Sequence, residues 1–551
     1  MLGGGERMSP EGETRMVTND STTLLLGGRI YTPSAPDATA MAVTGGTVVW
    51  VGQDAPARAL HPDAEVVDLD GAFVAPAFVD AHVHATATGL HLSGLDLTTV
   101  RSAADLLTAV RTAVVPGQVL LAHGWDESTW ADPRLPSRTE LDDAAGGNPI
   151  YLSRVDVHSA LVTTALAALT PGVDSVPGWS ADGPLTRDAH HRVRAAARTA
   201  ITRAQRQSAQ RTFLTTAAAR GVVAVHECGG PDIGGQEDFT DLLALAAEPG
   251  LPDVVGYWGE LGPDTARALG ARGAAGDLFV DGALGSRTAA LTAPYTDDPT
   301  TSGARYADAT AIGEHFAACT EAGLQAGFHV IGDAAVAEVV EGFRLAEKQV
   351  GQRALVAGHH RLEHLEMVTA EQAHALAEWG VVASVQPLFD HAWGGTSGMY
   401  AERLGTDRAV GLNPFATLAA EGVVLAFGSD TPVTALDPWA AVRAAVHHRS
   451  PEARLSARAA FTAHTRAGYR AAGINDGRTG TLVPGAPAHY AIWDATDLVV
   501  ATADTRVQRW STDPRSGVPP LPRLDPAGRL PHCLRTVRAG TVVYDEFTPA
   551  S

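Results

Sequence analysis

Short apolar runs that resemble strands alternate with alanine-rich helical stretches through the middle of this chain. The strand-like runs are 73–79, 221–226, 277–280, 325–330, 381–385 and 423–427. The helical stretches are 189–220, 334–349, 370–379, 439–446 and 456–472. Two parallel strands need a long connection, usually a helix, to bring the chain back to the same edge. The alternation therefore predicts an α/β fold with a parallel sheet or barrel.

Both ends of the chain show a different pattern, with short β-type runs separated by Gly-Gly and Pro turns. These runs lie within 21–67 and at 490–493, 498–501 and 534–544. We predict that the two ends pair into one small β-sandwich beside the central unit. The predicted boundaries are a disordered tail at 1–20, sandwich segments at 21–72 and 479–551, and the central unit at 73–478.

The segment from about 95 to 208 interrupts the alternation. It contains Trp125, Trp130 and Trp179 together with Pro-rich turns. We interpret it as an insertion over one face of the central unit, and we expect it to act as a lid.

Charge and cysteine content narrow the possible partners and the compartment. The 551 residues include 62 acidic and 41 basic side chains, a net charge of −21, which disfavours nucleic acid and anionic membranes as partners. The three cysteines are far apart and form no C-x-x-C pair, which favours reduced thiols in the cytoplasm. No apolar signal segment or stretch of about 18 apolar residues occurs. We expect a soluble cytoplasmic protein that binds a small molecule, and a homo-oligomer remains open.

A His-x-His pair ends the first central run, at Phe78-Val79-Asp80-Ala81-His82-Val83-His84. Side chains at i and i+2 of a strand point the same way, so His82 and His84 can present two imidazoles to one metal ion. Two partly buried histidines that hydrogen-bond to nearby backbone are the alternative interpretation.

Further potential ligands stand at the ends of later runs, where α/β barrels assemble their sites. They are His329, His364 and Asp430. A mixed set of imidazoles and carboxylates suits zinc or another divalent first-row metal and leaves room for a water molecule.

A competing motif overlaps one of these residues. His360-Arg361-Leu362-Glu363-His364 matches H-x-x-E-H, which on a helix would supply two zinc ligands and a catalytic Glu. This interpretation leaves the His-x-His pair unexplained, so we favour His364 as a ligand and His360 as its neighbour.

Seven stretches, taken in order, resemble the amidohydrolase superfamily. They are 75–84, 124–127, 281–289, 328–335, 361–364, 384–387 and 428–432. They are similar to the YtcJ-like, or amidohydrolase-3, branch, which includes N-substituted formamide deformylase. The resemblance implies a (β/α)8 TIM-type barrel with a composite β-sandwich, and metal-dependent hydrolysis, usually of C–N bonds.

The resemblance also implies roles for individual residues. His82 and His84 would bind the more buried metal, and His329 and His364 would face a second metal or the substrate. Asp430 would bind the first metal and take a proton from its water, which makes Asp430 and His364 the predicted catalytic residues. A divalent ion lowers the pKa of bound water to about 7, and a nearby carboxylate can carry the proton to the leaving nitrogen.

The sequence departs from the family pattern at Asp277. The resemblance implies a lysine at this position, which bridges two metals when carboxylated. The only lysine of this chain, Lys348, lies in a predicted helix. Asp277 can supply a shorter bridge, or the enzyme can work with one metal. We expect one tight site, with zinc as its metal, and leave the second open.

Two further residues are predicted to contact the substrate. Arg287 could bind a substrate carboxylate or an oxyanion, and a salt bridge that holds its loop is the alternative. His158 matches a histidine in the lid region of the family. We therefore predict a metal-dependent hydrolase of an amide or formamide bond. A deaminase, an ester or lactone hydrolase, and a metal-poor binding protein remain alternatives.

Overall fold

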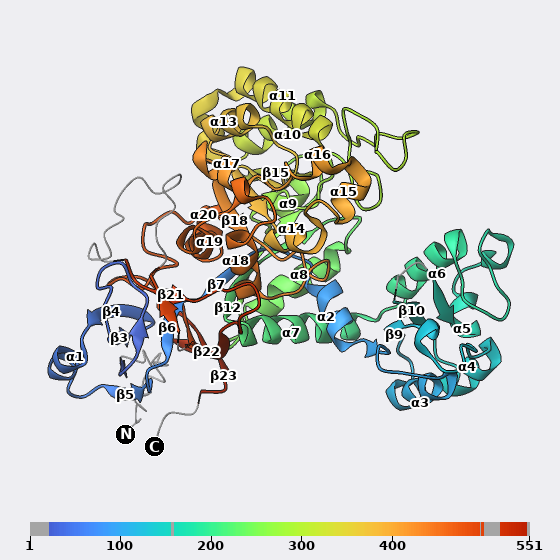
Figure 1. The fold of residues 1–551 in the computed structure, drawn as a ribbon, viewed down its shortest axis with the longest axis horizontal. Coiled ribbons are helices and arrows are strands. Elements are labelled where there is room, and N and C mark those ends of the chain that lie inside the picture. The colour runs from blue at the N-terminus through green and yellow to red at the C-terminus, as the bar shows by residue number, and fades with distance from the viewer. Residues whose placement is uncertain (1–20, 156–158, 496, 501–517, 548–551) are drawn as a thin grey trace, which may run out of the picture.

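The computed structural model describes residues 21–155, 159–495, 497–500 and 518–547. The predicted tail at 1–20 lies outside this part of the chain. The described residues form a central barrel, a β-sandwich beside one end of it, and an inserted unit on the other side (Figure 1).

Eight parallel strands form the central sheet, in the order β18-β17-β16-β15-β14-β13-β12-β7. They are β7 (Phe78–Val83), β12 (Val222–Gly229), β13 (Asp253–Trp258), β14 (Gly273–Ala274), β15 (Gln325–Val330), β16 (Arg361–His364), β17 (Val382–Val385) and β18 (Val424–Phe427). A parallel bridge between Val83 and Thr431 brings the end of β18 next to β7 and nearly closes the ring. The predicted TIM-type α/β fold class is thereby confirmed.

Helices follow the strands and cover the outside of the barrel (Figure 1). They are α2 (Ala85–Ser93), α7 (Arg203–Ala219), α8 (Gln236–Ala246), α9 (Asp264–Ala268), α10 (Ala309–Glu321), α11 (Asp333–Val350), α12 (Gln352–Gly358), α13 (Ala370–Glu378), α14 (Pro387–Trp393), α15 (Met399–Leu404), α16 (Thr406–Ala409), α17 (Phe415–Ala420), α18 (Pro438–Val446), α19 (Ala457–Ala463) and α20 (Arg466–Ala471). One large apolar cluster lies between most of these helices and the strands, while α15 and α16 pack in a separate cluster.

Two predicted helices are each divided in two. The stretch 189–220 forms most of α6 (Arg187–Thr199) and then α7, because Thr202 and Gln205 make a capping box that starts a new helix. The stretch 456–472 forms α19 and α20, which are separated at His464 and Thr465.

The fourth barrel strand along the chain, β14, lies earlier and is shorter than the sequence predicts. The run 277–280 is not a strand, and β14 ends at Ala274. Gly276 has a φ of +82°, a left-handed conformation that glycine adopts without strain and that ends the strand. Asp277 therefore follows the strand instead of starting it.

The β-sandwich combines strands from both ends of the chain. One sheet contains β4 (Thr47–Gly52), β3 (Ala40–Thr44), β1 (Thr22–Leu26) and β5 (Glu65–Asp68). The other contains β2 (Arg29–Ile30), β6 (Phe73–Pro76), β19 (Tyr490–Asp494), β22 (His532–Arg538) and β23 (Thr541–Asp545). The antiparallel pairing of β6 with β19 joins the two ends. Helix α1 (Asp54–Leu60) and the β20 (Leu498–Val499) and β21 (Leu521–Pro522) pair complete this part.

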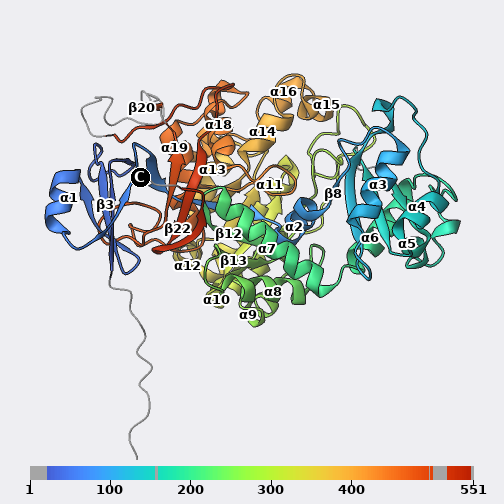
Figure 2. The same ribbon diagram turned by 90° about the horizontal axis from the view of Figure 1, so that it is seen from below.

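The inserted unit has its own sheet and its own apolar clusters. Its sheet order is β11 (Ala160–Val162), β10 (Ile150–Arg154), β9 (Leu120–Trp125) and β8 (Leu95–Asp96). Its helices are α3 (Ala103–Ala113), α4 (Arg138–Ala145), α5 (Thr164–Ala168) and α6, with short 3-10 turns at 127–129 and 173–175. Figure 2 shows this unit beside the barrel, next to α2 and α7. Its action as a lid stays a prediction.

Two general expectations concern membranes and thiols. Among the described residues, no helix combines the length and the apolar character needed to cross a membrane. Cys228, Cys319 and Cys533 are all buried and free.

Candidate metal centre

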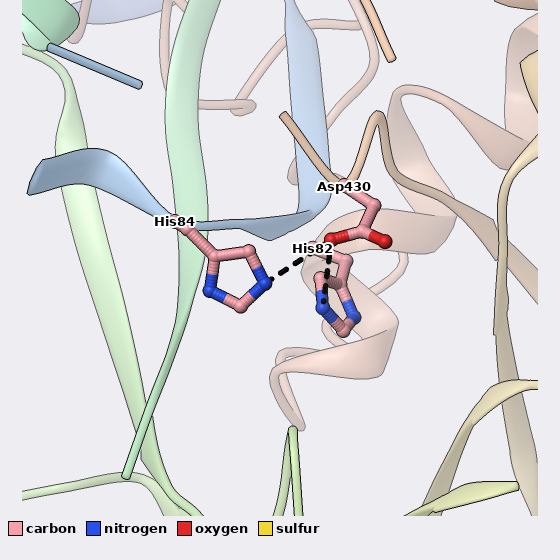
Figure 3. A group of neighbouring side chains, drawn as sticks. All are labelled: His82, His84 and Asp430. Atoms are coloured by element: carbon pink, nitrogen blue, oxygen red, sulfur yellow. Dashed lines mark ion pairs between the residues drawn. The ribbon is translucent and has the colours of Figure 1, made fainter. Parts of the chain in front are cut away.

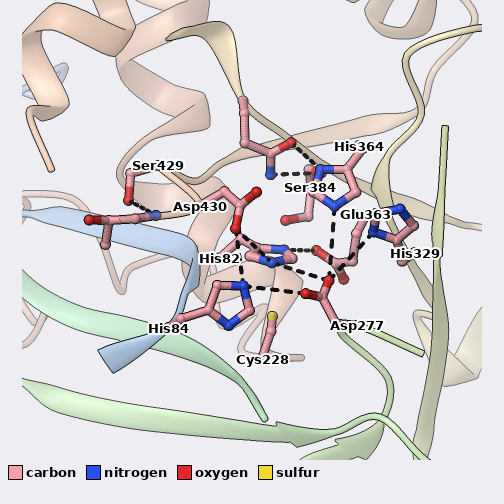
Figure 4. Close-up of polar contacts among 12 residues, drawn as sticks. His82, His84, Cys228, Asp277, His329, Glu363, His364, Ser384, Ser429 and Asp430 are labelled. Carbon is pink, nitrogen blue, oxygen red and sulfur yellow. Dashed lines mark hydrogen bonds and ion pairs between the residues drawn. The ribbon is translucent and has the colours of Figure 1, made fainter. Parts of the chain in front are cut away.

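The six predicted metal ligands meet at the carboxyl end of the barrel strands. His82 lies on β7 and His84 directly follows it, while the others come from the ends of β14, β15, β16 and β18. These others are Asp277, His329, His364 and Asp430. All six side chains are buried. Figure 3 shows His82, His84 and Asp430 close together, and Figure 4 shows all six side chains gathered in one place.

The first part of the centre joins the His-x-His pair to two carboxylates. His84 Nε2 lies 3.1 Å from Asp430 Oδ1 and 3.3 Å from Asp277 Oδ2. His82 Nε2 lies 3.5 Å from Asp430 Oδ1 and 3.5 Å from Asp277 Oδ1. Donor atoms at about 2.0–2.2 Å from one tetrahedral ion are about 3.3–3.6 Å apart, so this spacing fits an ion held between them.

The second part of the centre contains the two later histidines. His329 Nδ1 lies 3.6 Å and His364 Nε2 lies 3.9 Å from Asp277 Oδ1. The two oxygens of Asp277 therefore face different histidines, with Oδ2 toward His84 and Oδ1 toward His82 and this second pair. Asp277 lies at the middle of the group, which is where a bridging carboxylate would have to be.

Several polar atoms of the centre are buried without a hydrogen-bond partner. His82 Nε2, His329 Nδ1, Asp277 Oδ1 and Asp430 Oδ1 have no hydrogen-bond partner. Such atoms cost free energy unless something satisfies them. A divalent cation would satisfy all of them together, so these residues fit a metal ion. His82, His84 and Asp430 form one group with suitable spacing, and His82, Asp277 and His364 form another.

The electrostatics of the centre also favour positive charge. Burial lowers the pKa of His84, but the nearby carboxylates of Asp277 and Asp430 outweigh it and raise that pKa well above its usual value. Burial likewise lowers the pKa of His364, but the same two carboxylates raise it to about 9. Burial raises the pKa of the Asp277 carboxyl, but the surrounding imidazoles bring it well below its usual value. The carboxylates therefore require cations, and a metal ion would replace protons here.

Two of the six residues have an unusual backbone conformation. His364 has a φ of +73° and Asp430 a φ of +53°, in the left-handed region that side chains other than glycine rarely adopt. The Asp430 N–H donates to the His82 carbonyl over 2.8 Å, and the Ser429 N–H donates to Asp80 Oδ1 over 2.9 Å. These bonds fix Asp430 against β7, and strain of this kind is concentrated at functional sites.

Sequence reasoning missed the residues that hold the ligands in place. Glu363 Oε2 accepts a hydrogen bond from His82 Nδ1 over 2.9 Å, and Gln386 Oε1 accepts one from His364 Nδ1 over 2.8 Å. Asp281 is fully buried and accepts backbone N–H groups from Ala290 and Gly332. All three residues lie within the sequence stretches that resemble the amidohydrolase superfamily, and this position was the one sequence feature that could have pointed to them.

Glu363 remains ionised because it is paired with a buried arginine. Burial raises the pKa of Glu363, but the charge of Arg361 and the His82 ring bring it below its usual value. Arg361 Nε donates to Glu363 Oε1 over 2.6 Å, and its Nη2 donates to Oε2 over 2.9 Å.

The structure does not support the H-x-x-E-H interpretation. Residues 361–364 form strand β16 instead of a helix. His360 turns away from the centre. Its Nε2 lies 2.9 Å from Thr320 Oγ1, and its Nδ1 accepts a hydrogen bond from the Ala326 N–H.

The two predicted substrate contacts lie outside the group of six. Arg287 forms a two-bond ion pair with Asp297, at 3.1 and 2.7 Å, and Asp297 also binds Arg403 over 2.5 Å. In the structure, therefore, Arg287 makes the salt bridge that was its alternative role. His158 lies outside the described residues, and its role stays a prediction.

A nearly closed parallel barrel with these histidines and carboxylates at its strand ends defines a metal-dependent hydrolase. The family model described as "Amidohydrolase family" matches residues 65–544. The chain belongs to this family, and to its YtcJ-like branch.

Several known proteins are similar to this chain over most of its length. Protein LONG AFTER FAR-RED 3 of Arabidopsis thaliana is 28% identical and covers 86% of this chain and 88% of its own. Putative amidohydrolase YtcJ of Bacillus subtilis is 28% identical, with 71% and 76% covered. N-substituted formamide deformylase of Arthrobacter pascens is 23% identical, with 88% and 95% covered.

A solved structure has the same fold. The uncharacterized metal-dependent hydrolase from Pyrococcus furiosus matches with a TM-score of 0.71 and 27% identity, covering 86% of this chain and 98% of its own.

Proposed function

We propose that this protein is an amidohydrolase that uses a divalent metal ion, zinc by preference, to cleave the C–N bond of a small amide or formamide. The convergence of buried imidazole nitrogens and two carboxylates, with several atoms left without a donor, supports the metal-dependent hydrolysis. The similarity to N-substituted formamide deformylase supports the choice of bond. Three buried, unpaired cysteines are consistent with a cytoplasmic setting, which we also propose.

The mechanism assigns a separate task to each part of the centre. A bound divalent ion would lower the pKa of water to about 7 and polarise the scissile carbonyl. His82, His84 and Asp430 would hold it, with Asp277 beside them. The Asp430 carboxylate, 3.1 Å from His84 Nε2, would accept the proton of the attacking water and pass it to the leaving nitrogen. His364 and His329 would orient the carbonyl group from the opposite side of Asp277.

The first test is the metal content of the wild-type protein and of Asp277→Ala. Both proteins are dialysed against metal-free buffer and measured by mass spectrometry. Two metals per chain that fall to one would identify Asp277 as a bridge, and one metal in both would identify a mononuclear enzyme. A wild-type protein without metal would contradict the proposal and favour the binding-protein alternative.

The second test compares substrates. The metal-loaded enzyme is assayed with N-substituted formamides, simple amides, aminopurines or aminopyrimidines, and lactones. We expect turnover of the first two classes, and we expect Asp430→Asn to lower kcat by about 100-fold or more, as for loss of a general base. Turnover confined to the amino heterocycles or the lactones would replace the proposed bond with deamination or ester hydrolysis.

A further inference from the structure

The four histidines of the centre differ in what supports the ring nitrogen that points away from it. This second nitrogen fixes the tautomer and orientation of the ring and changes its strength as a ligand. The support behind the ring differs from one histidine to the next, although all four rings lie within 3.9 Å of the same carboxylate, Asp277 (Figure 4).

His82 has a carboxylate behind it. Its Nδ1 donates to Glu363 Oε2 over 2.9 Å, so its Nε2 lone pair points toward Asp277 and Asp430. Glu363 is held by two bonds from Arg361, and both side chains are completely buried. Arg361 is itself fixed, because its Nη2 donates to the Ala81 carbonyl over 2.6 Å. The support for His82 is therefore rigid and negatively charged.

His364 has a neutral amide behind it. Its Nδ1 donates to Gln386 Oε1 over 2.8 Å, so its Nε2 lone pair points toward Asp277. The Gln386 amide group donates to the Ser384 carbonyl over 3.4 Å, which places its oxygen, and not its nitrogen, on His364. An amide oxygen fixes the ring as a carboxylate does, but it adds no negative charge.

The remaining two rings have weaker support. His329 Nε2 lies 3.3 Å from the Gly282 carbonyl, which directs Nδ1 toward Asp277. His84 Nδ1 is buried without a hydrogen-bond partner. Among the four rings, only His82 therefore has a charged partner behind it.

We propose that Glu363 and Gln386 are positioning residues that make the two parts of the metal centre unequal. The part formed by His82, His84 and Asp430, supported by Glu363, binds a divalent ion first and tightly. The part formed by His329 and His364, supported by Gln386, binds a second ion more weakly. A carboxylate behind a histidine raises the basicity of the ring more than a neutral amide does. This inference rests on the proposed metal-dependent function and adds the order in which the centre fills.

The test is a titration of the full-length, metal-stripped protein with Co²⁺, followed by its absorption bands and by metal content after dialysis. For the wild-type protein we expect two steps, the first tighter by about 10-fold or more. Glu363→Gln should lower the Co²⁺ affinity of the first step by about 10–100-fold and leave the affinity of the second step unchanged. Gln386→Ala should weaken only the second.

A variant with the opposite effect separates positioning from simple damage to the fold. Gln386→Glu places a carboxylate behind His364 and should tighten the second step, which a misfolded protein cannot do. Asp241→Asn is the control, because Asp241 is a buried carboxyl on the outer helix α8 that pairs with Arg203 and with no histidine of the centre. This variant should bind Co²⁺ in both steps with affinities within about threefold of those of the wild-type protein.

Each other outcome has a defined meaning. Equal steps in the wild-type protein, or a first step that Glu363→Gln does not change, would overturn this inference and leave the proposed function intact. If the wild-type protein binds only one ion, a loss of Co²⁺ affinity in Glu363→Gln but not in Gln386→Ala supports the inference. A loss of affinity in Gln386→Ala but not in Glu363→Gln overturns it. A wild-type protein that binds no Co²⁺ would contradict the proposed function itself.

Discussion

The ion pair between Arg361 and Glu363 provides a stringent test of the barrel core. Arg361 is completely buried and bonds to both Glu363 oxygens, to the Ala81 carbonyl and to His226 Nδ1, and its guanidinium lies 4.1 Å from the centre of the Tyr257 ring. Arg361→Met keeps a long apolar stem but leaves the Glu363 carboxylate buried without its counterion. Removal of one partner from a buried ion pair costs about 3–5 kcal/mol.

That cost can be converted into a change in melting temperature. A barrel of about 300 residues unfolds with an entropy of about 0.6 kcal/mol/K, at about 2.1 cal/mol/K per residue. A loss of about 3–5 kcal/mol should therefore lower Tm by about 5–8 °C. The protein is stripped of metal before the measurement, because a bound ion would add its own stabilisation.

The double variant provides the decisive comparison. Glu363→Gln alone leaves Arg361 unpaired and should lower Tm by a similar amount. Together with Arg361→Met it removes the remaining charge, so the double variant should melt no lower than either single variant by more than about 2 °C. The assay is differential scanning calorimetry of all four proteins. Additive losses, or a change of less than about 2 °C for Arg361→Met, would refute a coupled buried pair.

Three shorter predictions concern other parts of the structure. A Cβ on Gly428 would lie 2.6 Å from the His82 backbone nitrogen, so Gly428→Ala should displace the first ligands and lower metal content, whereas Gly235→Ala, with nothing within 4 Å, should not. Arg287→Ala should change KM for a neutral formamide by less than about twofold, because this partly exposed side chain pairs with Asp297; a large rise in KM would favour a substrate role. Burial lowers the pKa of His464 to about 4, below its ordinary 6.5, so the folded protein binds fewer protons and Tm should fall as pH falls from about 6.5 to about 4. His464→Asn, which can still donate to the Val79 carbonyl, should flatten part of that slope in the metal-stripped protein, and an unchanged slope would contradict this origin.

The fold class and the grouping of the six residues could be predicted from the sequence because both follow from local patterns. Alternating strands and helices imply a parallel barrel, and polar residues at strand ends in such a barrel meet at one edge. His82, His84, Asp277, His329, His364 and Asp430 do meet there. Their roles as ligands stay predictions.

The supporting residues could not be predicted because they act across long separations in sequence. Glu363 lies 281 residues from His82 and Asp281 lies 51 residues from Gly332, and no local pattern says which side chains face each other. Arg287 illustrates the same limit. Its partner Asp297 is only 10 residues away, yet the sequence could not decide between this ion pair and a substrate.

The position of Asp277 depends on the backbone around it more than on the reach of its side chain. The sequence left open whether an aspartate, with its shorter reach, can take the place of a carboxylated lysine. The early end of β14 changes this, because Gly276 turns with a φ of +82° directly before Asp277. A Cβ on Gly259, at the end of β13, would lie 2.7 Å from the Asp277 carbonyl oxygen, so the absence of a side chain there allows the two backbones to approach closely. The short carboxylate then lies 3.3–3.9 Å from all four histidines. The substitution therefore preserves a central anion, since the backbone supplies the proximity that the side chain lacks.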